Sequence, residues 1–115
     1  MNQKIERIAE ILSWYCFSYS SEIQLQDQIE SVFKKNGINY RREFRLSKSD
    51  IVDFFIDGIA VEIKVKGRAM PIFRQLERYT KHDNVSEILL ISTKRYPLPP
   101  QISGKNAYSL YVGAL

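Results

Sequence analysis

The feature that most constrains this chain is an Asp-Gly pair at residues 57 and 58, set between two short and largely apolar segments. Asp-Gly in such a setting is typical of a two-residue β-hairpin turn. The turn fixes the register in which residues 51–56 pair with residues 59–66. A slip of one residue would move charged side chains into the buried face of the hairpin, so this register is favoured over its neighbours.

The predicted register brings two carboxylates and one ammonium group together. Asp53 is expected opposite Glu62 with their Cβ atoms about 5 Å apart, and Lys64 projects from the same face. Two like charges in this position cost ~0.2–1 kcal/mol, which a divalent cation would offset. The alternative is a surface hairpin whose acidic pair is compensated by Lys64 and Lys66 alone. The other face is expected to be apolar, formed by Val52, Phe54, Ile56, Val61, Ile63 and Val65.

The remaining patterns predict an α+β fold with a mixed β-sheet flanked by helices. Helices are expected over residues 3–17, 21–36 and 71–82, and strands over residues 38–46, 51–56, 59–66, 86–92 and 107–112. The expected order is α-α-β-β-β-α-β-β in one domain. Its parts are a helical extension (1–17), an αβββαβ core (21–92) and a C-terminal loop and strand (93–115).

The second helix has the clearest signals for its start and its buried side. Ser21 and Gln24 have the spacing of a capping box, in which the serine caps the helix and the glutamine bonds back. The side chains expected to face the core are Ile23, Leu25, Ile29, Val32 and Phe33. These signals predict an amphipathic helix packed on the sheet.

The composition indicates the class of protein and the cellular compartment to expect. With 44% hydrophobic and 26% charged residues, the chain resembles an ordinary globular domain, and no apolar run approaches the ~18 residues of a membrane span. Cys16 is the only cysteine, and the N-terminus lacks a secretory signal pattern, so a cytoplasmic protein without a membrane partner is expected. A net charge of +4 permits a polyanionic partner.

The hairpin reads IVDFFIDGIAVEIKVKG, and this pattern resembles the D-x(n)-E-x-K motif of the PD-(D/E)xK nuclease superfamily, in the short form of its small phage and bacterial members. Val52 stands where the superfamily's name has a proline. The resemblance extends over residues 21–91 and implies a restriction-endonuclease-like core. It implies a Mg²⁺-dependent DNA endonuclease, with Mn²⁺ able to substitute, in which Lys64 stabilises the transition state.

The same resemblance implies a set of metal ligands. Asp53, Glu62 and the backbone carbonyl of Ile63 would hold the ion. Many members of the superfamily add a glutamate from the helix before the sheet, and here Glu22 is the first candidate and Glu30, two helical turns later, is the rival. An ordinary first-turn charge that complements the helix dipole explains Glu22 equally well.

Substrate contacts are expected from the helix after the hairpin and from the basic residues. Gln75 and Tyr79 resemble the Q-x-x-x-Y element of RecB-like nucleases, which would position substrate. Alternatively Tyr79 is a core residue and Gln75 is solvated. The candidate DNA contacts, or otherwise a solvated basic surface, are Arg41, Arg42, Arg45, Lys66, Arg68 and Arg74. DNA is the expected partner, a homodimer would serve to cut two strands, and the alternative function is a catalytically silent DNA-binding module of nuclease fold.

Overall fold

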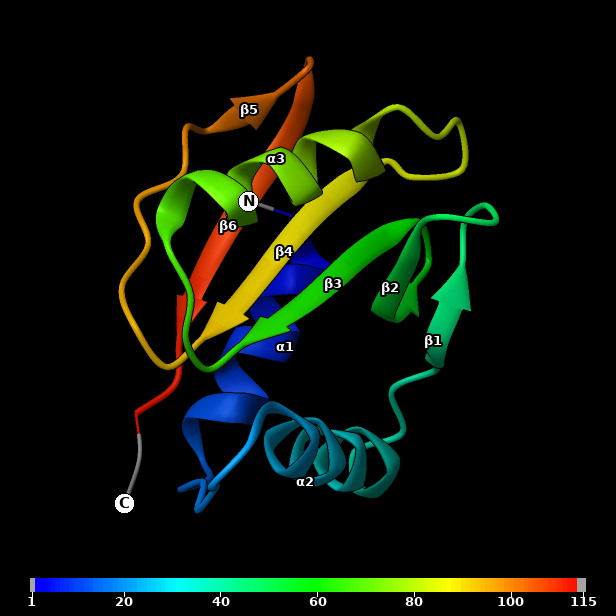
Figure 1. Ribbon diagram of the computed structural model, residues 1–115. Helices are drawn as coiled ribbons and strands as arrows, with labels where there is room; N and C mark the ends of the chain where they lie inside the picture. Colours follow the sequence, from blue (N-terminus) through cyan, green and yellow to red (C-terminus); the bar gives the residue numbers. More distant parts are fainter. Residues whose placement is uncertain (1, 114–115) are drawn as a thin grey trace.

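A mixed six-stranded β-sheet forms the centre of the fold (Figure 1). The computed structural model describes residues 2–113. The strands are β1 (Arg41–Arg45), β2 (Ile51–Ile56), β3 (Ile59–Lys64), β4 (Glu87–Ser92), β5 (Gln101–Ile102) and β6 (Lys105–Tyr111). Their order across the sheet is β1-β2-β3-β4-β6-β5. Strands β3, β4 and β6 run parallel, so their carboxyl ends lie at one edge of the sheet.

Helices cover both faces of this sheet (Figure 1). They are α1 (Gln3–Ser13), α2 (Glu22–Lys35) and α3 (Ala69–Thr80). Buried side chains of α1 and α2 form one apolar cluster with Phe54 and Leu89, whereas those of α3 form a second cluster with Leu90. The α+β class is therefore confirmed, in the order α-α-β-β-β-α-β-β-β. None of the helices within residues 2–113 combines the length and the apolar character needed to cross a membrane.

Several element boundaries differ from the predicted ones. Helix α1 ends at Ser13, and the next residue, Trp14, is 62% exposed, although the spacing predicts helix to residue 17. Strand β1 begins at Arg41 rather than residue 38, and Glu43 within it has a positive φ of 52°, although exposure still alternates along the strand. The two-residue strand β5 is not predicted by the sequence pattern. Long apolar patterns are thus located correctly, and short irregular segments are not.

Helix α2 begins as predicted but presents one apolar side chain to solvent. The Ser21 hydroxyl accepts the backbone N–H of Gln24 at 3.2 Å, and the Gln24 side chain accepts the backbone N–H of Ser20 at 2.7 Å. The prediction that Ile23 faces the core is wrong, because this side chain is 57% exposed. With 3.6 residues per turn, Ile23 lies roughly 200° around the helix from the buried Leu25.

The hairpin register is confirmed, but the predicted ladder is interrupted. Phe54 pairs with Val61, Phe55 with Ala60 and Ile56 with Ile59. No such backbone pair joins Asp53 to Glu62 within the described chain. The prediction that Val52 shares a face with Phe54 is also wrong, because Val52 packs in the cluster of α3 and Phe54 in that of α1 and α2. The first half of β2 therefore turns toward α3 and separates from β3.

The turn of this hairpin supplies a test of the fold. Gly58 has a φ of +83°, and a Cβ added there would lie 2.6 Å from the Ser86 hydroxyl oxygen, which donates a hydrogen bond to the Gly58 carbonyl. Gly104 has a similar φ of +79° with nothing within 4 Å, so Gly104→Ala is a matched control. We expect Gly104→Ala to lower the free energy of unfolding by about 1 kcal/mol and Gly58→Ala by about 2–3 kcal/mol in urea denaturation. Equal losses would show that the contact with Ser86 is unimportant.

Candidate metal centre

Asp53 lies where strands β2 and β3 separate. A regular continuation of the hairpin ladder would have the backbone N–H of Ile63 donate to the carbonyl of Val52. Instead this N–H donates to Oδ2 of Asp53 at 2.7 Å. Strand β2 keeps its pairing with β1, where Val52 is paired with Phe44. The carboxylate of Asp53 therefore occupies the gap between two strands of the same sheet.

Helix α3 bridges this gap with a buried tyrosine. The Tyr79 hydroxyl lies 3.1 Å from the carbonyl oxygen of Ile51 on β2 and 3.3 Å from Oε1 of Glu62 on β3, and its one proton serves either acceptor. Gln75 donates from Nε2 to the second oxygen of Glu62 at 3.0 Å and to the Tyr79 oxygen at 2.8 Å. Both residues of the predicted Q-x-x-x-Y pair therefore contact a candidate metal ligand, and Gln75 is not simply solvated.

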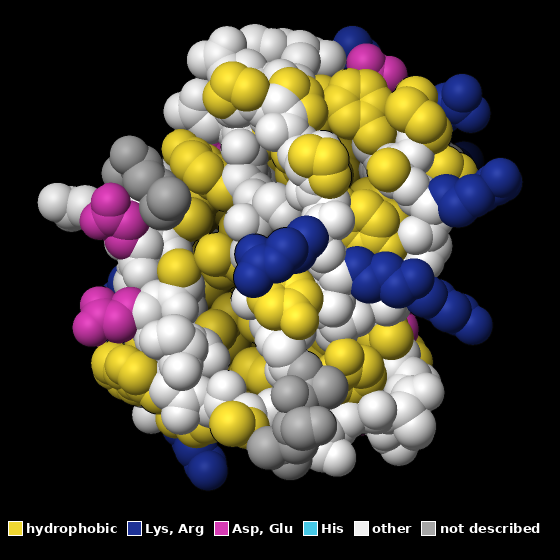
Figure 2. All heavy atoms as spheres, turned by 90° about the vertical axis from the view of Figure 1, so that its left-hand side faces the viewer, with side chains coloured by type: hydrophobic (Ala, Val, Ile, Leu, Met, Phe, Trp, Pro, Cys, Tyr) yellow, Lys and Arg dark blue, Asp and Glu magenta, His cyan; other side chains and the backbone are white. Residues whose placement is uncertain are grey.

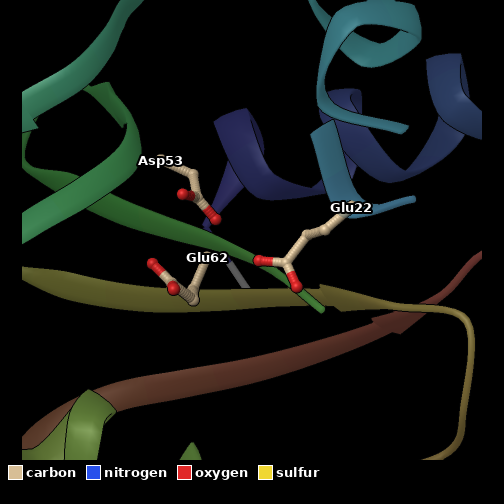
Figure 3. Close-up of side chains that lie close together, drawn as sticks. All are labelled: Glu22, Asp53 and Glu62. Atoms are coloured by element: carbon tan, nitrogen blue, oxygen red, sulfur yellow. The ribbon is translucent and has the colours of Figure 1, made fainter. Parts of the chain in front are cut away.

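Glu22 reaches the same place from the other side of the sheet (Figure 3). One carboxylate oxygen from each of Glu22, Asp53 and Glu62 lies within 4.8 Å of the others. Helices α2 and α3 pack on opposite faces, so Glu22 and Glu62 converge because the sheet is open at Asp53. Among residues 2–113 no side chain donates a hydrogen bond to the Glu22 carboxylate. The gap thus collects three acidic groups from three elements.

The rival carboxylate on α2 is engaged elsewhere. Glu30 accepts a hydrogen bond from the Tyr40 hydroxyl at 2.8 Å and one from Nη1 of Arg42 at 3.0 Å. The Tyr40 hydroxyl bond, together with the nearby guanidinium, lowers the pKa of Glu30 despite its partial burial. Of the two candidates, the structure brings Glu22 to the site and leaves Glu30 outside it.

Lys64 and the carbonyl of Ile63 complete the group. The ammonium nitrogen of Lys64 lies 3.4 Å from Oε2 of Glu62, and its side chain is only 18% exposed. The Lys64 carbonyl accepts the backbone N–H of Thr93 at 3.1 Å, next to β4. Successive carbonyls of a strand point to opposite edges, so the Ile63 carbonyl points toward β2 and Asp53. All four residues of the predicted motif therefore meet at one point.

The site is short of positive charge. Burial raises the pKa of Glu62, and the neighbouring charge of Asp53 raises it further, with Lys64 opposing both effects. Burial also raises the pKa of Asp53, which the N–H of Ile63 opposes and the charge of Glu22 reinforces. Burial raises the pKa of Tyr79 as well, so this residue stays a hydroxyl and a donor. One ammonium group faces three carboxylates, and a bound dication would correct the imbalance.

The predicted basic residues divide into two sets. Arg42 folds onto α2, where Nη1 donates to Asp27 at 2.7 Å and Nη2 donates to Gln26 at 3.2 Å, so both Nη groups are occupied within the protein. The exposed residues are Arg41 and Arg45 on β1, Lys66 and Arg68 after β3, and Arg74 on α3. Lys66 and Arg68 lie two and four residues after Lys64 and are nearest to the carboxylates in sequence.

Two basic residues at the same edge are not among the predicted contacts. Lys94 and Arg95 are exposed and follow β4, whose carboxyl end lies beside that of β3 through the bond from Thr93 to Lys64. The signal available in the sequence is the Lys94-Arg95 pair, which follows the apolar run 88–91 after Ser92 and Thr93. This pair indicates proximity to the site only once the parallel pairing of β3 with β4 is known.

Similarity to known proteins does not identify the site. No protein-family model, no curated protein and no solved structure matches this chain. What the site does therefore has to follow from its own residues and their geometry.

The raised pKa values predict how stability depends on pH when no metal is present. The folded-state pKa of Glu62 is about 8 against an ordinary 4.5, and that of Asp53 is about 6 against 3.8. Between pH values of about 4 and about 8, the folded protein therefore binds more protons than the unfolded chain. The free energy of unfolding falls as the pH rises through this range. Urea denaturation with EDTA at a series of pH values measures this slope, and Mg²⁺ should restore stability at pH 8. The variant Glu62→Gln should flatten the profile, and an unchanged slope in this variant would contradict the account.

Proposed function

We propose that this protein is a metal-dependent DNA endonuclease that hydrolyses phosphodiester bonds with the chemistry of the PD-(D/E)xK superfamily. The observation that carries this proposal is the convergence of Glu22, Asp53 and Glu62 within 4.8 Å, with the Lys64 ammonium 3.4 Å from Glu62. Structural ion pairs balance their charges, whereas this group has an excess of carboxylates, of which Glu62 is buried and Glu22 and Asp53 are partly buried, at an opening in the sheet. That excess is what a hydrolytic metal centre requires.

The donor set suits Mg²⁺. Carboxylate and carbonyl oxygens are the ligands this ion takes from proteins, and it usually keeps several waters besides one or two carboxylates. Asp53, Glu62 and the Ile63 carbonyl would hold the ion, with Glu22 holding it directly or through a water. Mn²⁺ accepts the same ligands. When bound, the metal supplies a water of lowered pKa and neutralises charge on the attacked phosphate.

The chain's own residues fix the geometry of this chemistry. The backbone N–H of Ile63 holds Asp53, while Gln75 and Tyr79 together hold both oxygens of Glu62. A preorganised site of this kind loses little energy to rearrangement during reaction. Lys64 places its ammonium where it can stabilise the extra negative charge of a pentavalent phosphate. Asp53 and Glu62 are held by groups that belong to β3 and α3, and Lys64 by its contact with Glu62.

DNA is the proposed substrate because the surroundings of the site are basic. Lys66 and Arg68, two and four residues after Lys64, are exposed, and Arg74 is exposed on α3. Such residues contact backbone phosphates without reading sequence. We place the protein in the cytoplasm, where DNA and the reduced thiol of its one cysteine are compatible, and a second copy would be needed to cut both strands at once.

Cleavage of plasmid DNA tests the proposal. We expect activity with Mg²⁺ or Mn²⁺ and none with EDTA. The variants Asp53→Asn and Lys64→Ala should each lower the rate by about 10²-fold or more, because they remove a metal ligand or the charge that stabilises the transition state. Glu22→Gln should also lower the rate, whereas Glu30→Gln, on the same helix but outside the group, should cut DNA at the rate of the unaltered protein. Equal activity of Lys64→Ala and the unaltered protein would overturn the mechanism.

A metal titration separates cleavage from binding alone. Calorimetry should detect uptake of Mg²⁺ or Mn²⁺ by the unaltered protein and none by Asp53→Asn. DNA binding without any metal uptake would instead identify a catalytically silent module of the same fold.

A further inference from the structure

A second group of side chains lies at the carboxyl edge of the sheet and has no part in the metal centre. Tyr111 ends β6 and is 48% exposed. The guanidinium of Arg95 lies 4.4 Å from the centre of its ring, a close cation–π contact. Beside this pair is an open cavity of about 310 Å³, lined by Arg95, Tyr96, Pro97, Ser109 and Tyr111. The pair presents a flat, positively charged surface at the mouth of a cavity.

The strand register places this pair beside the metal centre. Lys64 is paired with Ser92 on β4, and Ser92 is paired with Tyr111 on β6. Side chains paired across parallel strands project from the same face, so Tyr111 shares with Lys64 the face covered by α3. Two strand spacings of 4.8 Å put the backbones of Lys64 and Tyr111 about 10 Å apart. Tyr96, which lines the cavity, also donates its hydroxyl proton to the Gly67 carbonyl at 2.6 Å, next to the basic residues after β3.

The surface between the two sites suits a polyanion. Lys66 and Arg68, which follow β3, and Lys94, which follows β4, are exposed. The chain contains no Asp or Glu after Glu87, so the segments that form the cavity carry positive charge only. Figure 2, which shows this side of the molecule, has Lys and Arg side chains projecting from its centre and right-hand half. The phosphates of a DNA strand that extends from Lys64 over these segments would therefore contact no acidic side chain of theirs.

We propose that Arg95 and Tyr111 form a stacking site for a nucleobase of single-stranded DNA next to the bond that is cut. Aromatic rings and stacked guanidinium groups bind unpaired bases without regard to sequence. In a duplex the bases are already stacked on one another and do not reach such a surface. The favoured substrate is therefore DNA with an unpaired segment beside the cut, such as a frayed end, flap or branch. This choice of substrate rests on the proposed nuclease function, whereas base binding itself does not.

Binding in EDTA tests the stacking site without cleavage. Fluorescence anisotropy would compare a labelled oligothymidine of about 20 nucleotides with a blunt duplex of the same length. We expect Tyr111→Leu and Arg95→Ala to bind the single strand at least about fivefold more weakly, with duplex binding within about twofold of the unaltered protein. Tyr111→Phe, which keeps the ring, should bind the single strand as the unaltered protein does. Arg7→Ala, which removes a cation from α1 on the other face of the sheet, should leave both affinities unchanged.

The outcomes distinguish this inference from the proposed function. Unchanged single-strand binding by Tyr111→Leu would overturn the stacking site, as would an equal loss for single strand and duplex. Thermal unfolding by circular dichroism would show that the variants are folded at the temperature of the assay. A protein that binds the single strand through Tyr111 but never cuts DNA would retain the stacking site and lose the nuclease proposal. A protein that cuts DNA, but whose single-strand binding is unchanged by Tyr111→Leu, would retain the nuclease proposal and lose the stacking site.

Discussion

The hydrogen bond from the backbone N–H of Ile63 to the carboxylate of Asp53 is the interaction on which the rest of the site depends. It gives an amide of β3 an acceptor other than a β2 carbonyl, so the two strands separate without leaving a buried N–H unpaired. The gap that results lets a glutamate from α2 and a glutamate on the α3 face of the sheet approach each other. In an unbroken sheet, the backbone of two paired strands would stand between these groups.

The opening concentrates negative charge where little water can screen it. Glu62 is only 3% exposed, and its neighbours supply two neutral donors and one ammonium group. A buried carboxylate surrounded in this way either takes up a proton or binds a cation. Ionising these carboxylates without a cation beside them therefore costs free energy. A bound dication would remove that cost, so the site is suited to one. The raised pKa values of Glu62 and Asp53 and the proposed affinity for a dication would have one cause, the placing of a buried carboxylate beside partly buried ones.

The sequence predicted those features that depend on neighbours along the chain. An Asp-Gly turn and alternating apolar residues determine the register of the hairpin, and the register brings Asp53 near Glu62. The separation of β2 from β3 was not predictable in this way, because an alternating pattern gives no sign that the Asp53 carboxylate replaces a β2 carbonyl as the acceptor of the Ile63 N–H. The bond from Tyr79 to Ile51, 28 residues away, likewise becomes known only once α3 is placed on the sheet. The same limit applies to Arg42, whose partners on α2 are known only once the first strand is placed against that helix. The hairpin register was therefore predicted from local pattern, whereas the faces of Ile23 and Val52 were not. Glu22, Gln75 and Tyr79 were candidates through the family resemblance alone, and their contacts are known only from the structure.

The most direct test of a metal centre at this gap is a crystal soaked in Mn²⁺ and measured at an X-ray wavelength where manganese scatters anomalously. We predict one strong anomalous peak within about 2.5 Å of oxygens from Asp53 and Glu62, with the Ile63 carbonyl facing it. Glu22 should lie beside the ion, either as a direct ligand or one water away. A well-ordered crystal in which this gap shows no peak at high Mn²⁺ concentration, with Lys64 lying between the carboxylates instead, would contradict the account.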